Sequence, residues 1–213
     1  MSYALDFDDL DDISLSLAYF ADTHLPLGHL DYSCGTIADP YKILKNMRQD
    51  THLSALPNIQ KSVTEKMKYI AAFPSFRNHV QSIHLHSDLL VDIALFALRL
   101  YITSPSIITL HCITATHALR LAKPSIVNFE EAIAYLWQAI CTLYIVVGLP
   151  SIKNERDTTE EQMTESEWGQ WKKKVLLSNN VHVIKLFYTC LEEKKIYGFS
   201  EYDKAARIIL GSE

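Results

Sequence analysis

The sequence predicts an all-α protein, and three observations carry this prediction. Apolar residues recur three and four positions apart along most of the 213 residues, and no β-type alternation persists beyond a few residues. Glycine and proline are scarce, with 6 Gly and 7 Pro, which disfavours a turn-rich β sandwich. We expect one bundle-like domain over residues 1–213, with eight or nine helices around a very apolar central core of three helices.

The first part of the chain is expected to form helices over residues 10–22, 40–51 and 57–73, with an irregular segment over 23–39. The first of these helices has an acidic start and apolar residues at helical spacing. Pro40 and Pro57 suit the first turn of the next two helices, because a proline there loses no hydrogen bond that the helix needs. Pro74 is expected to end the third helix.

The middle of the chain is expected to form the core, with helices over residues 84–102, 105–122 and 128–147. Ser104 and Pro105 resemble an N-cap followed by a first-turn proline, and Asn128 is typical of an N-cap. Charged residues are rare here, but Ser104, Ser106, His111 and His117 interrupt the first apolar run. The runs of residues 100–119 and 132–149 are expected to be buried helices rather than membrane spans, because Pro105 breaks the first and acidic residues precede the second.

The charge density rises sharply after Pro150, which predicts an exposed charged loop over residues 151–163. The sequence Thr164-x-x-Glu167 is a capping box that starts another helix. Asn179 or Asn180 is expected to begin a long helix that ends at Gly198, and Ser200-x-x-Asp203 to begin a last one.

Composition and missing motifs exclude several classes of protein. The net charge of −5 and the pI near 6.0 give no reason to expect a nucleic-acid or anionic-membrane partner. The chain has no GxG, GxSxG, HExxH or ExxH sequence, and its four cysteines are far apart, so no metal-binding residues are identified, and the need for a metal or flavin stays open. Reduced cysteines and an acidic N-terminus, unlike a targeting peptide, lead us to expect a cytoplasmic protein.

The nine histidines include the main candidates for chemistry. His84 and Asp88, four residues apart, would share a helix face as an oriented base or as a surface ion pair. His111 and His117 diverge by about 120° around a helix, with Thr114 between them, so they cannot chelate one metal together. Each can instead be a hydrogen-bonded core histidine.

Three further residues stay open between a structural and a functional role. Trp137 lies at helical spacing with two tyrosines, which is typical of packing. His182 and Lys185 lie in the first turns of a late helix, where a cation is mildly unfavourable, and this is a weak indication of function.

Several short segments resemble the questin oxidase-like family. They are LHCITATHALR at residues 110–120, YLWQA at 135–139, HVIKL at 182–186 and LAYFA at 17–21. The order and rough spacing agree with the family over most of the chain. Two departures are that the family carries a further N-terminal segment before the region of residues 17–21, and a glycine where this chain has Cys112.

The resemblance implies an NADPH-dependent oxidoreductase that opens an aromatic or quinone ring with oxygen in the manner of a Baeyer–Villiger oxidation. A pocket between the helices of 84–102, 105–122 and 128–147 would then hold a small aromatic substrate. We expect His111 or His117 to take a phenolic proton, Arg120 to balance the negative charge and Thr114 to bind a substrate oxygen.

The substrate would further contact a second group of side chains, namely His84, Asp88, Trp137, His182 and Lys185. The alternative is a non-catalytic helical module that pairs with a helper chain or with a second copy of itself. This alternative predicts an exposed apolar surface where the missing helices would pack.

Overall fold

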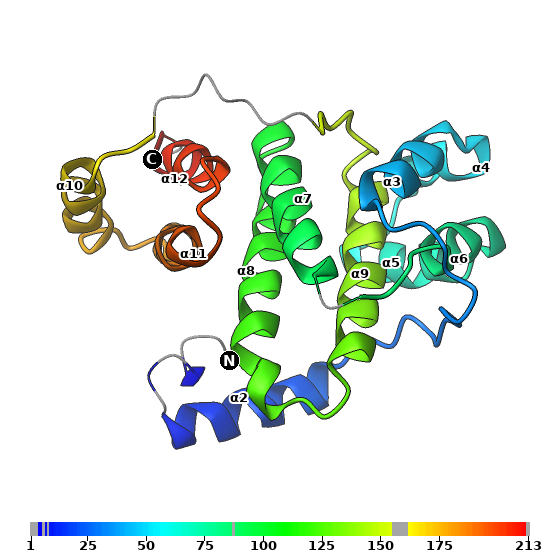
Figure 1. Cartoon of the computed structure of the whole chain (residues 1–213), viewed down its shortest axis with the longest axis horizontal. Helices are drawn as coiled ribbons and strands as arrows, with labels where there is room; N and C mark the ends of the chain where they lie inside the picture. The colour runs from blue at the N-terminus through cyan, green and yellow to red at the C-terminus, as the bar shows by residue number, and fades with distance from the viewer. Residues whose placement is uncertain (1–3, 6, 8, 87, 155–161, 212–213) are drawn as a thin grey trace.

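The computed structural model describes residues 4–5, 7, 9–86, 88–154 and 162–211, and this part of the chain is all-α (Figure 1). An isolated β-bridge between Ile37 and Ile83 is its one piece of extended pairing. The α-helices are α2 (Leu10–Thr23), α3 (Pro40–Gln49), α4 (Thr51–Ser54), α5 (Val63–Ala71), α6 (Pro74–Gln81), α7 (Leu89–Thr103), α8 (Ile107–Ala122), α9 (Phe129–Val146), α10 (Glu165–Val175), α11 (Val181–Tyr197) and α12 (Glu201–Gly211). Two 3₁₀ helices, η1 (Leu56–Asn58) and η2 (Lys123–Ser125), complete the described elements.

The described part holds eleven α-helices, so the expected count of eight or nine was too low. The two additional helices are α4, because Asp50 ends α3 and caps a new helix, and α6, which begins at Pro74. Pro57 opens only the short η1, and a capping box at Ser62 then begins α5. Pro74 follows the end of α5 but also starts α6, because its fixed φ and missing N–H suit a first turn as well as they block a helix interior.

Several of the predicted helix ends are confirmed. Asn128 caps α9, Thr164 and Glu167 form the capping box of α10, and Asn180 caps α11. Gly198 ends α11 with a φ of 68°, a left-handed conformation that glycine adopts without strain. The cap of α8 is Ser106 rather than Ser104, because the Thr109 hydroxyl and the Ser106 side chain satisfy each other's backbone N–H groups.

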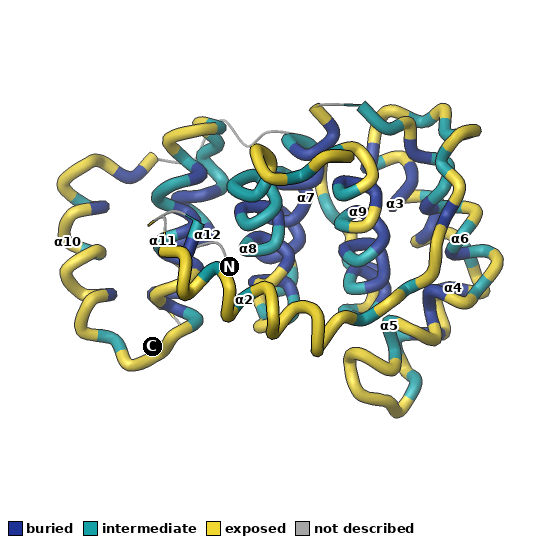
Figure 2. Tube along the Cα trace, turned by 90° about the horizontal axis from the view of Figure 1, so that it is seen from below, coloured by how far each residue is buried: buried dark blue, intermediate teal, exposed yellow. Residues whose placement is uncertain are grey.

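The helices are arranged in three groups, with α7, α8 and α9 in the middle (Figure 1). Helices α3 to α6 lie on one side and α10 to α12 on the other, while α2 runs past the ends of α8 and α9. Every helix from α3 to α12 contributes buried side chains to one apolar cluster. The core therefore extends well beyond the three central helices, and α2 stands out as exposed along its length (Figure 2).

The expected charged loop over 151–163 falls partly outside the described residues, since 155–161 are not described. Its first residues, 151–154, pack beside α3 and α7 through contacts of Ser151 and Asn154. Within the described residues, no helix combines the length and the apolar character needed to traverse a lipid bilayer.

Candidate functional site

Two of the predicted catalytic residues meet at a buried carboxylate between α8 and α11. Glu193 Oε1 lies 2.5 Å from His117 Nδ1 and 2.6 Å from an Arg120 guanidinium nitrogen. His117 is fully buried and Glu193 nearly so, whereas Arg120 is partly exposed. His117 and Arg120 are three residues apart on α8, which places both toward the same turn of α11.

This carboxylate is held in its ionised form. Burial alone would raise the pKa of Glu193, but hydrogen bonds from His117 and Arg120, together with their charges, outweigh burial and lower the pKa below its ordinary value. A carboxylate that accepts from an imidazole fixes the ring's orientation and tautomer. The arrangement can therefore serve either as an oriented proton carrier or as a buried ion pair that joins two helices.

His111, His182 and Lys185 form a second cluster, nearer the surface of the same helix pair. The rings of His111 and His182 are 5.7 Å apart, centre to centre, and meet edge to face. Partial burial, with the neighbouring His182 and Lys185, lowers the pKa of His111. Thr114 donates a hydrogen bond to the His111 carbonyl oxygen and so bonds within its own helix.

His84 and Asp88 do not share a helix face. The helix expected to begin at residue 84 begins at Leu89, and Asp88 is its N-cap residue. The His84 backbone N–H instead donates to the Ile37 carbonyl oxygen, beside the β-bridge, and the His84 ring stacks on His86. This contact with Ile37, in the segment before α3, therefore keeps His84 out of the helix.

Trp137 is fully buried, far from the α8–α11 contact. Its indole Nε1 donates to the Val80 carbonyl oxygen at the end of α6, 3.3 Å away. The side chain therefore holds α9 against α6, which is the packing role that its spacing indicates.

The two larger pockets lined by described residues have walls other than the α7, α8 and α9 that were expected. One, of about 660 Å³, lies between α3, α7 and α9, with Phe96 and Tyr144 at its base. Another, of about 690 Å³, lies between the end of α2, residues 24–29, α5 and α9. Neither of these two pockets is lined by His111, Thr114 or His117, so these side chains lie apart from both pockets.

No group of three or more His, Cys, Asp or Glu side chains is arranged to hold a metal ion within the described residues. Comparison of the chain with protein-family models, with curated proteins and with solved structures gives no match. Any functional argument therefore depends on the geometry of this molecule.

Glu193, which contacts two of the predicted catalytic side chains, was not among the residues predicted from the sequence. A signal for it exists, because Glu193 continues the buried stripe of Val183, Leu186 and Cys190 at helical spacing. A charged residue in register with such a stripe is buried only when it has partners. The basic residues of α3, which line a pocket together with residues of α7 and α9, were not among the predicted site residues either.

Proposed function

We propose that the protein is a non-catalytic helical module that pairs with another protein chain through α2. The observation that carries this is that α2, 14 residues long, buries none of its side chains. Leu10, Leu15 and Tyr19 are each at least 70% exposed on it. An isolated helix of this length is marginal in water, and large exposed apolar side chains mark interaction surfaces.

The chemistry of α2 identifies the kind of partner. Leu15 and Tyr19, one turn apart, lie on one face together with Asp11, Asp12 and Asp22. All of these residues are exposed. A partner helix with an apolar stripe flanked by lysine or arginine would bury the two apolar side chains and pair with the surrounding carboxylates.

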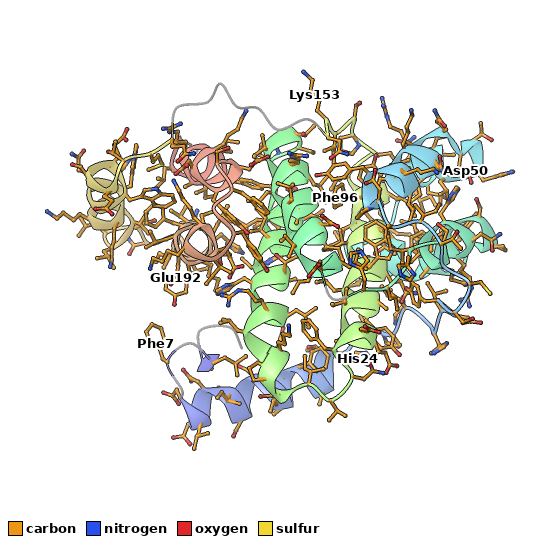
Figure 3. All side chains as sticks on the ribbon, in the orientation of Figure 1. Phe7, His24, Asp50, Phe96, Lys153 and Glu192 are labelled. Carbon is orange, nitrogen blue, oxygen red and sulfur yellow. The ribbon has the colours of Figure 1, made fainter. Side chains whose placement is uncertain are left out.

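The surface continues around the helix. Leu15, Ser16, Tyr19, Phe20 and Thr23 form an open and mainly apolar patch along α2. At the far end of the helix, Phe20 and His24 border the larger pocket against α9. Figure 3 shows Phe7 near the start of α2 and His24 at its end.

Two synthetic helical peptides with the same leucine stripe, one flanked by lysines and one by glutamates, test the proposal. We expect the lysine peptide to bind at least tenfold more tightly, and Leu15→Gln/Tyr19→Gln to abolish the binding. Leu176→Gln/Leu177→Gln, which removes two apolar side chains exposed at the end of α10, is the matched control. Equal binding of the two peptides, or binding that survives the α2 substitutions, would refute the proposal. If sedimentation shows a dimer that the α2 substitutions dissociate, the partner of α2 is a second copy of the chain instead.

A second candidate function is oxygen-dependent oxidation of an aromatic or quinone-type small molecule. One observation favours it, namely that His117 and Arg120, two residues carried over by the questin oxidase-like resemblance, share the ionised Glu193. In such a reaction one oxygen atom of O₂ enters the substrate, and two electrons from NADPH reduce the other to water. The described residues contain no βαβ unit, so NADPH, which is implied by the resemblance alone, would need a different mode of binding.

Oxygen and NADPH consumption with a panel of hydroxyanthraquinones tests this second candidate. Turnover should be lost in His111→Ala and His117→Gln, with helical circular dichroism retained, and kept in the surface control Lys195→Gln. If oxygen and NADPH are consumed no faster with the protein than without it, for every compound of the panel, the result would count against an oxidase.

A further inference from the structure

The pocket beside α3 has features of a binding site that neither proposed function uses. Its walls come from α3, α7, the end of α9 and the nearby residues 151–154, so three distant parts of the chain meet there. Its volume of about 660 Å³ is in the range of pockets that hold small molecules. Its lining includes Asp39, Tyr41, Lys42, Lys45, Arg48, Phe96 and Tyr144.

The pocket is basic although the chain is acidic. Lys42, Lys45 and Arg48 follow one another at three-residue spacing on α3, and Asp39 is the single acidic residue of the lining. The lining thus carries a formal charge of about +2, from three cations and one carboxylate, in a chain of net charge −5. Among the described residues neither Lys42 nor Lys45 forms an ion pair, so their charges are available to a ligand.

The base of the pocket is aromatic and rigid. Phe96 meets Tyr41 edge to face at 6.0 Å and Tyr144 at 5.7 Å, so that one ring from each of three helices forms a continuous row. Figure 3 shows Phe96 within this group of helices. The Tyr144 hydroxyl donates to the Pro150 carbonyl oxygen, which fixes that ring.

Tyr41 adds a fixed hydrogen-bond donor. The buried Arg99 donates to the Tyr41 hydroxyl oxygen at 3.1 Å, and Arg99 is itself held by Glu201 and by the Asn154 carbonyl oxygen. Burial raises the pKa of Tyr41 to about 12, more than the nearby Arg99 lowers it. The hydroxyl therefore keeps its proton, which it can donate while its oxygen accepts from Arg99.

We propose that this pocket binds a small aromatic phosphate monoester, with the ring against Tyr41, the partly exposed member of the aromatic row, and the phosphate on the α3 cations. A phosphate monoester carries about −1.5 to −2 charges at neutral pH, which matches the lining, whereas a carboxylate carries one. Asp39 and Arg48, nine residues apart, are separated by roughly 13 Å along α3. A ligand that accepts Lys and Arg hydrogen bonds at one end and donates to a carboxylate at the other fits this polarity.

Calorimetric titration of the full chain with AMP, adenosine and inorganic phosphate at constant ionic strength tests the proposal. AMP supplies a ring, hydroxyl donors and a phosphate monoester. Adenosine lacks the phosphate, and inorganic phosphate lacks the ring and the ribose hydroxyls. We expect AMP to bind at least tenfold more tightly than either. Lys42→Gln/Lys45→Gln should weaken the binding of AMP by roughly threefold to tenfold, which is the range for two partly exposed charge contacts. The same double variant should leave the binding of adenosine unchanged.

A matched control separates this site from a general charge effect. Lys172→Gln/Lys173→Gln removes the same charge from exposed positions on α10 and should leave AMP binding unchanged. Binding of AMP no tighter than that of inorganic phosphate, or equal loss in both double variants, would overturn the proposal. Because the pocket is distinct from the exposed face of α2, neither result bears on the helical-partner proposal.

Discussion

Glu193 holds His117 across the contact between α11 and α8, with 2.5 Å between Oε1 and Nδ1. Because the pKa of Glu193 is lowered in the folded protein, its unfolded form binds a proton at a higher pH than its folded form. The resulting stabilisation is complete above about pH 4.3, the ordinary glutamate value, and is lost as the pH falls through the folded pKa. We expect the free energy of unfolding to differ between wild type and Glu193→Gln at pH 7, and this difference to shrink as the pH is lowered. Urea unfolding at pH 7 and at a series of acid pH values measures it.

The same contact predicts strong coupling between its partners. Glu193→Gln leaves His117 and Arg120 beside a neutral amide and should cost about 2–4 kcal/mol at pH 7. Addition of His117→Gln should then cost much less than it does in the wild type, since the pair has already been broken. Additive losses in urea unfolding would show that the two side chains act independently.

Asp203 joins three elements on the other side of the same helix. Its Oδ1 accepts from the Trp168 indole N–H at 3.0 Å and from Lys194 Nζ, and the carboxylate is almost fully buried. Asp203→Ala should destabilise the fold by about 2–4 kcal/mol, because it leaves both donors without an acceptor. Glu192→Gln, which breaks the exposed pair with Lys195 on the same helix, should cost less than about 1 kcal/mol in the same unfolding measurement.

The pKa of His111 should lie below the ordinary histidine value of about 6.5, because of its partial burial and the neighbouring His182 and Lys185. Lys185→Gln should raise the pKa of His111, while Lys195→Gln, at the far end of α11, should leave it unchanged. NMR titration of the His111 ring protons measures both effects. A pKa of His111 that does not move in Lys185→Gln would remove Lys185 from this cluster.

Two glycines should respond oppositely to alanine. A Cβ at Gly35 would lie 1.9 Å from the Ile83 carbonyl oxygen, next to the β-bridge, so the backbones must separate and stability should fall by about 1–3 kcal/mol. A Cβ at Gly169 in α10 meets open space, and alanine there should gain about 0.5–1 kcal/mol from helix propensity. Thermal unfolding of both variants compares them, and a neutral Gly35→Ala would disprove the tight approach.

The sequence allowed good prediction of the later helices and poor prediction of the earlier ones. The starts of α9, α10 and α11 have caps whose partners lie within three residues, so local pattern suffices. Between Pro57 and Leu89 the boundaries depend on whether a proline ends or starts a helix and on the pairing of Ile37 with Ile83. Such pairing joins residues 46 apart, which no local window contains.

The candidate site divides in the same way. His111, Thr114, His117 and Arg120 lie on α8 as their spacing predicts, because 3.6 residues complete a turn whatever packs beside the helix. Their separation into a buried carboxylate cluster and a surface cluster depends on where α11 crosses α8. The sequence determined the all-α class, the caps and the faces of single helices, since these depend on local hydrogen bonds and periodicity. Only the tertiary structure decided which faces are covered: it left α2 exposed and brought α3, α7 and α9 together, because burial depends on contacts between distant segments.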